Sequence, residues 1–148
     1  MPQSERHALV VGGGTMGVGI IAMFLGHGWK VDVVSRSAGT RDGLPAACAR
    51  ALTAMGRPAD TSALVTHATL PEASWPTIDL VVETVTEDLA LKQTLFAEME
   101  TLAKPDAALT SNSSISGWRC GRSTGRPAIP SWPPAGAGSS GTRRSRYR

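Results

Sequence analysis

Three glycines, Gly12, Gly14 and Gly17, stand in the spacing G-x-G-x-x-G between an apolar β-rich run and an apolar helical run. Gly12 suits a tight strand-to-helix turn, and Gly17 allows a helix to pack closely on a strand. Gly14 has no Cβ and lets the backbone approach a pyrophosphate. The N–H groups of a helix beginning near Thr15, at its positive dipole end, would face the phosphate charge. The pattern predicts a dinucleotide-binding turn.

Two other interpretations compete for this stretch. The run from Ala8 to Gly28 contains no Asp, Glu, Lys or Arg, which is also typical of a signal peptide or a membrane span. The glycines inside the run and the polar His27 argue against that interpretation. The second alternative is an ordinary βα unit whose glycines serve packing alone. A strand-like run at residues 30–34 follows at the distance expected for a nucleotide-binding unit, which favours the first interpretation.

The residues after this second strand bear on the choice of cofactor. In NAD-binding sheets an Asp or Glu usually ends the strand and accepts hydrogen bonds from the ribose hydroxyls. Here Ser35 and Arg36 follow the strand, while Asp32 lies in its middle. Arginine pairs with phosphate oxygens in bidentate fashion, so Ser35 and Arg36 favour NADP over NAD. The alternative is that Arg36 is a solvated loop residue.

Length and composition narrow the class of protein. A chain of 148 residues is long enough for one domain with a usable core. Cys48 and Cys120 form no disulfide framework or C-x-x-C motif, which indicates a reducing compartment, and we expect the cytoplasm. The three histidines show no spacing typical of metal ligands, and we expect no metal site.

Apolar runs and turn residues alternate along the first 116 residues. We expect strands at 7–11, 30–34, 63–66, 78–83 and 107–110, and helices at 15–25, 46–55 and 88–103. Residues 38–45 are predicted to be a loop, and residues 70–77 mostly loop. On the last helix the expected apolar stripe is Leu91, Leu95, Met99 and Leu102, with Lys92 off the stripe.

This alternation predicts an α/β fold with a doubly wound parallel sheet, a Rossmann domain over residues 1–116. Ligands of such sheets bind at the carboxyl ends of the strands. Four segments should therefore meet at one edge: the glycine turn, Ser35–Arg36, residues 84–87 and residues 111–114.

Three blocks of sequence carry a family resemblance. Residues 12–20 read G-G-G-T-M-G-V-G-I, residues 79–96 read D-L-V-V-E-T-V-T-E-D-L-A-L-K-Q-T-L-F, and residues 111–114 read S-N-S-S. Together they resemble the N-terminal domain of the 3-hydroxyacyl-CoA dehydrogenases over about residues 7–116. The resemblance implies NAD as cofactor, with Thr15 and Met16 inside the cofactor-binding turn. It also implies oxidation of the 3-hydroxyl of an acyl-CoA to the 3-oxo compound by hydride transfer.

The resemblance assigns roles to four further residues. Glu87 and Lys92 match the acid and the lysine that lie beside the bound cofactor. Asn112 and Ser114 match the polar pair near the nicotinamide and the substrate hydroxyl, which makes Ser114 the candidate catalytic residue. A structural role is the alternative for three of these residues. Ser114 would then be a serine that forms a turn, Glu87 an acid favoured by the helix dipole, and Lys92 a solvated lysine on the helix surface.

Other parts of the sequence depart from the family pattern. The family has a histidine general base some two dozen residues past the serine, worth about 10²–10⁴-fold in rate, yet no histidine follows His67. The residues after 116 also do not match the family's helical domain, which completes the acyl-CoA site and the homodimer. We expect this chain alone to be inactive. The alternatives are a non-catalytic dinucleotide-binding remnant, or a dehydrogenase of another 3-hydroxy acid, such as carnitine or a sugar acid.

The tail, residues 117–148, has seven arginines and no Asp, Glu or Lys. Its Arg-, Gly-, Pro- and Ser-rich composition without periodicity is typical of GC-rich codons translated in a shifted frame. A genuine disordered linker is the alternative. A charge run of this kind can bind nucleic acid, but shifted-frame arginines carry no evolved function, and we expect no nucleic-acid partner. The expected partner is a small molecule, an acyl-CoA or another 3-hydroxy acid.

Overall fold

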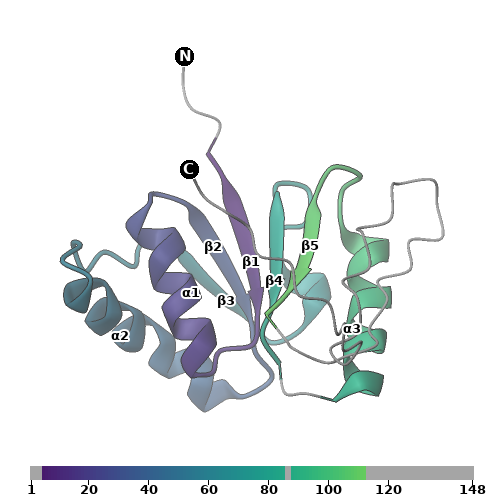
Figure 1. The fold of residues 1–148 in the computed structure, drawn as a ribbon, viewed down its shortest axis with the longest axis horizontal. Coiled ribbons are helices and arrows are strands. Elements are labelled where there is room, and N and C mark those ends of the chain that lie inside the picture. The colour runs from purple at the N-terminus through teal and green to yellow at the C-terminus, as the bar shows by residue number, and fades with distance from the viewer. Residues whose placement is uncertain (1–4, 86–87, 113–148) are drawn as a thin grey trace, which may run out of the picture. The chain divides into compact units, whose positions relative to one another are not determined.

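The computed structural model describes residues 5–85 and 88–112, which form a five-stranded parallel sheet with helices (Figure 1). In chain order the elements are β1 (His7–Val11), α1 (Thr15–Gly26), β2 (Lys30–Val34), α2 (Ala38–Ala54), β3 (Leu64–His67), the 3-10 helix η1 (Leu70–Glu72), β4 (Leu80–Glu83), α3 (Leu89–Leu102) and β5 (Ala108–Ser111). The strand order is β3-β2-β1-β4-β5, and every neighbouring pair is parallel. The prediction of a doubly wound parallel sheet is confirmed. The predicted boundary at residue 116 and the tail lie outside the described residues.

The apolar run from Ala8 to Gly28 divides between two elements. Its first part is β1, and its second part is α1, which has 12 residues. Among the described residues, no helix combines the length and the apolar character needed to cross a membrane.

One face of the sheet packs against α1 and α2, which Figure 1 shows on the β1–β2–β3 half of the molecule. Because side chains alternate along a strand, β1 and β2 each send every second residue to this face. The buried cluster consists of Ala8, Val10, Ile21, Phe24, Val31, Val33, Leu44 and Cys48. This face is therefore an apolar core built from two strands and two helices.

The predicted loop at residues 38–45 is wrong, because α2 begins at Ala38. The Ser37 side chain accepts a hydrogen bond from the Thr40 backbone N–H at 3.2 Å and caps the helix. Pro45 lies inside α2, where a proline lacks an N–H and is costly. Burial of Leu44 and Cys48 against the sheet offsets this local cost.

The predicted apolar stripe of α3 is also wrong in part. The residues that α3 buries are Lys92, Phe96 and Met99, whereas Leu91 and Leu95 are only half-buried. Lys92 is 1% exposed, so it is not a solvated helix lysine. On this inward face the Lys92 ammonium reaches Glu83 on β4, beside the apolar side chains of Phe96 and Met99.

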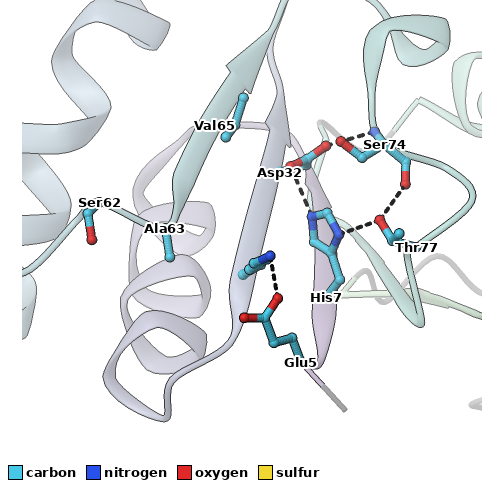
Figure 2. Close-up of a pocket in the computed structure, with 9 residues that line it drawn as sticks. Glu5, His7, Asp32, Ser62, Ala63, Val65, Ser74 and Thr77 are labelled. Atoms are coloured by element: carbon cyan, nitrogen blue, oxygen red, sulfur yellow. Dashed lines mark hydrogen bonds and ion pairs between the residues drawn. The ribbon is translucent and has the colours of Figure 1, made fainter.

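A second polar cluster lies around Asp32, which is 2% exposed (Figure 2). Its carboxylate binds His7 Nε2 and His67 Nε2, each at 3.0 Å, and accepts a 2.8 Å hydrogen bond from the Ser74 N–H. His7 Nδ1 in turn lies 2.8 Å from Thr77 Oγ1. Asp32 thus joins β1, β2, β3 and the segment after η1, and it lies mid-strand as predicted.

Asp32 is expected to make the stability of the fold sensitive to acid. Burial alone raises the pKa of this carboxyl, but hydrogen bonds from Ser74 and His7 outweigh burial and lower the pKa below its ordinary value of 3.8. A carboxyl with a lowered folded-state pKa stabilises the fold above the unfolded-state pKa, and this contribution disappears as the pH falls through the folded-state value. We expect Asp32→Asn to cost roughly 1–3 kcal/mol at neutral pH and much less below pH ~3.

Urea unfolding of the wild type and the variant between pH 7 and pH 2 measures this difference. Asp60→Asn is the matched control, because Asp60 is exposed and its pKa is lowered by a backbone hydrogen bond from Ser62. The control should lose much less stability at neutral pH. A cost for Asp32→Asn that is the same at every pH would contradict the expected role.

Candidate functional site

The carboxyl ends of four strands meet at one edge of the sheet. The residue after each strand donates its backbone N–H to a neighbouring strand: Gly12 to Val34 (2.9 Å), Ser35 to His67 (3.0 Å), Thr84 to Val11 (2.8 Å) and Asn112 to Glu83 (2.8 Å). With the strand order, these bonds place the four residues along the edge in the sequence Ser35, Gly12, Thr84, Asn112. The expected meeting of the four segments is confirmed for their described residues.

Gly12 and Gly17 hold the turn between β1 and α1 in a geometry that excludes other residues. Gly12 has φ +109°, and a Cβ there would lie 2.6 Å from Thr84 Oγ1. A Cβ on Gly17 would lie 2.4 Å from the Gly12 carbonyl oxygen. The Thr84 hydroxyl fastens the turn to β4 through 3.2 Å hydrogen bonds to the carbonyls of Val11 and Gly12.

Gly14 differs from these two glycines because a Cβ there would meet nothing within 4 Å. It is the N-cap of α1 and has no side chain to accept from the first-turn N–H groups. By contrast, Ser37 caps α2, and Asp88 caps α3 by accepting from Leu91 N at 3.0 Å. The first turn of α1, beside the exposed Met16, thus lacks a side-chain cap, and a helix N-terminus of this kind is suited to bind an anion.

Ser35 and Arg36 lie at the end of β2, and the Arg36 side chain is exposed. Arg41 fixes the backbone of both residues, because its Nη1 donates to the Ser35 carbonyl at 2.6 Å and to the Arg36 carbonyl at 3.0 Å. Sequence reasoning missed Arg41, which lies in the segment predicted to be a loop. A Ser-x-x-x-Arg spacing, with the serine as a helix N-cap, is the signal that could have found it.

A buried ionic network lies at the ends of β4 and β5. Lys92 Nζ is 3.2 Å from Glu83 Oε2, and the Ser111 hydroxyl donates to the same oxygen at 2.6 Å. Glu83 Oε1 accepts from the Val85 N–H at 2.6 Å. Sequence reasoning gave Glu83 and Ser111 no role of their own. The available signal was an acidic residue ending an otherwise apolar, central strand.

The remaining predicted site residues are placed as follows. Thr15 is exposed in the first turn of α1, and Asn112 is exposed immediately after β5. Glu87 and Ser114 lie outside the described residues. The structure thus brings the glycine turn, the end of β2, Lys92 and Asn112 to the same edge of the sheet.

The cavity drawn in Figure 2 lies at the opposite end of the strands. Its volume is about 390 Å³, and His7 and Lys30, the first residues of β1 and β2, are among its lining residues. Its ionisable side chains already have partners: Glu5 pairs with Lys30, and His7 contacts Asp32. In the part of the chain that the structure describes, no group of three or more His, Cys, Asp or Glu is arranged to hold a metal.

Comparison with known proteins agrees with this geometry. The family model described as "3-hydroxyacyl-CoA dehydrogenase, NAD binding domain" matches residues 7–120. The chain belongs to this family. It is 32% identical over 126 residues to 3-hydroxybutyryl-CoA dehydrogenase of Clostridioides difficile, covering 80% of this chain and 45% of the relative. It is 33% identical over 112 residues to 3-hydroxyadipyl-CoA dehydrogenase of Escherichia coli, covering 71% of this chain and 24% of the relative.

The fold also matches that of a solved structure. The crystal structure of M. tuberculosis FadB2 superposes with a TM-score of 0.64 at 28% identity, over 77% of this chain and 43% of that protein. The chain thus spans less than half the length of these relatives. It is an NAD(H)-binding domain of the 3-hydroxyacyl-CoA dehydrogenase type, with a Rossmann fold, and the family match gives no support to the preference for NADP.

Gly17→Ala tests the close contact between α1 and β1. The new methyl would overlap a backbone oxygen that cannot move without displacing the strand, and we expect a loss of roughly 1–3 kcal/mol in the free energy of unfolding. Urea denaturation measures the loss.

Gly19→Ala in the same helix is the control, because its Cβ would meet nothing within 4 Å. That change should raise stability by up to about 1 kcal/mol, since alanine favours a helix over glycine. If both variants were equally stable, the turn would not be as tight as the structure has it.

Proposed function

We propose that the edge described above binds the diphosphate of NAD(H) at the first turn of α1. The single observation that carries this proposal is the open, uncapped helix N-terminus at Gly14, where a Cβ would project into free space. Backbone amides and the helix dipole there offer hydrogen-bond donors and partial positive charge to an anion. Gly12 and Gly17 bring the helix close enough to the strand to present those donors.

The order of the residues along the edge suits an extended dinucleotide. With the diphosphate at α1, the adenosine ribose would lie toward Ser35 and Arg36, and the nicotinamide toward Thr84 and Asn112. Bound NAD supplies a hydride acceptor. In this proposal Ser114 holds the substrate hydroxyl, and Glu87 and Lys92 flank the cofactor.

We further propose that the protein to which this domain belongs oxidises the 3-hydroxyl of a 3-hydroxyacyl-CoA to the 3-oxo compound. The names of the relatives, 3-hydroxybutyryl-CoA and 3-hydroxyadipyl-CoA dehydrogenase, support a small acyl-CoA substrate. The family resemblance supports a homodimer. Cys48, which is free and buried, supports a reducing compartment such as the cytoplasm.

A second candidate function is nucleotide binding without catalysis. The observation that favours it is the absence of any histidine after His67 in the sequence, since the family's general base is a histidine past the serine. In this case the chain binds the dinucleotide but does not catalyse the oxidation.

Gly14→Ala tests the diphosphate site. Its backbone, with φ −72° and ψ −171°, is accessible to alanine, so the free energy of unfolding should stay within about 0.5 kcal/mol of the wild type. The methyl would occupy the space of the diphosphate, and overlap of roughly 1–3 kcal/mol would weaken NADH binding about tenfold or more. Fluorescence titration with NADH measures the affinity.

Gly19→Ala again serves as control and should bind NADH as the wild type does. In the same preparations, acetoacetyl-CoA with NADH should give no turnover under the non-catalytic alternative. Turnover by the wild type would remove that alternative. A wild type that NADH and NADPH leave unperturbed at millimolar concentrations would overturn the proposed site itself.

Arg36→Ala tests whether the end of β2 accepts a 2′-phosphate. If the Arg36 guanidinium pairs with that phosphate, the variant should bind NADPH about tenfold more weakly, because a charge-assisted hydrogen bond is worth ~1.5–3 kcal/mol. NADH lacks the 2′-phosphate, and its affinity should be unchanged. Equal effects on the two nucleotides in parallel titrations would refute a role for Arg36 in the choice of cofactor.

A further inference from the structure

The network around Glu83 is the most deeply buried ionic group among the described residues. Glu83 is 0% exposed and Lys92 is 1% exposed. The two carboxylate oxygens of Glu83 receive three donors: the Val85 N–H on one oxygen, and the Lys92 ammonium and the Ser111 hydroxyl on the other. A single carboxylate thus binds the turn after β4, helix α3 and the last residue of β5.

Burial of this kind is costly. Removing two opposite charges from water carries a desolvation penalty that their attraction often fails to offset, and an apolar pair of the same size is commonly as stable. Stability alone therefore gives no reason to keep Glu83 and Lys92 at this place. Their location offers a functional reason. Glu83 directly precedes Thr84 and lies beside Ser111, and both of these residues are at the edge proposed to bind the cofactor.

The number of N–H donors on Lys92 also supports a role at the cofactor edge. A lysine ammonium has three N–H donors, and Glu83 is the one acceptor bound to Lys92 within the described ranges 5–85 and 88–112. The bond to Glu83 fixes where the ammonium stands. Its other two N–H donors have no acceptor among the described residues, although Lys92 is only 1% exposed.

We propose that Glu83 is a positioning residue for the nucleotide site: its buried carboxylate holds the Lys92 ammonium and, through the Val85 amide, the turn after β4 in place beside the bound dinucleotide. This inference rests on the proposed function of the edge. Glu83 acts through Lys92 and the turn and does not itself touch the ligand.

The opposite end of β4 supplies a matched control. Asp79 lies next to the first residue of that strand, and its carboxylate binds Lys104 Nζ at 2.6 Å. Those side chains are 43% and 25% exposed, so the pair is solvated. Asp79→Asn removes an ion pair at the same strand but far from the edge.

The experiment is a double-mutant cycle in the full chain, with NADH affinity and unfolding free energy measured for each variant. Glu83→Gln and Lys92→Met should each weaken NADH binding about tenfold, since each loses a hydrogen bond to a charged group. The double variant should bind no more weakly than Lys92→Met alone, because Glu83 acts through the lysine. Asp79→Asn should leave NADH affinity unchanged.

Glu83→Gln leaves a buried lysine without its counter-ion and is the variant most at risk of not folding. Ser111→Ala keeps the ion pair and removes one hydrogen bond to Glu83, and it should weaken NADH binding about threefold. Wild-type affinity in Ser111→Ala, or independent and additive losses in the double variant, would overturn the positioning role.

Amide exchange separates this inference from the proposed function. The Val85 amide should be protected in the wild type and should lose protection in Ser111→Ala and Glu83→Gln, with or without nucleotide. If the wild type binds neither NADH nor NADPH, the proposed function is wrong. Exchange then still tests whether Glu83 holds the turn after β4, and an unprotected Val85 amide in the wild type overturns that hold.

Discussion

The contact between Gly17 of α1 and the carbonyl of Gly12 is the constraint on which the rest of the edge depends. A single methyl group there would lie 2.4 Å from the oxygen, so helix and strand stand as close as two backbones can. The positive φ of Gly12 turns the chain sharply enough to start the helix at once, and Thr84 fastens the turn to β4. The helix amides therefore open at the sheet edge, over the centre of the strand order, where ligands of parallel sheets bind.

Both faces of the sheet bury apolar residues, but one of them also buries charged residues, since Leu9 and Val81 lie on the same face as Asp32. Under α1 and α2 the packing is apolar, and Val10 and Val33 are wholly buried there. The other face carries two charged clusters, around Asp32 and around Glu83. Asp32 joins the strands to the segment that follows η1, whereas Glu83 joins the sheet to α3. Each carboxylate receives several donors, which is the condition under which a buried charge is tolerated.

The sequence was sufficient to predict the sheet, because strands buried on both faces and glycines at a turn leave a clear local pattern. The start of β1 and both ends of β2 were predicted to the residue. The error at residues 38–45 arose because Pro45 disfavours a helix locally, while the packing of Leu44 and Cys48 that rescues it depends on distant strands. Lys92 was named as a site residue by the family resemblance, but its burial was missed for the same reason: a lysine indicates solvent, and its partner Glu83 is nine residues away on another element.

Several features that cost the fold stability lie together at one end of the sheet. The turn with φ +109°, the contact that admits no Cβ, the uncapped helix and the deepest ion pair all lie at the carboxyl edge. The amino ends carry self-satisfied pairs, such as Glu5 with Lys30 and Asp79 with Lys104. A sequence selected for stability alone would relieve such local conflicts, and folds keep them where a site requires them. The concentration of these features beside Gly14 is thus a structural argument for a binding edge: it shows why the motif glycines are needed there, and the buried pair of Glu83 and Lys92 adds to it.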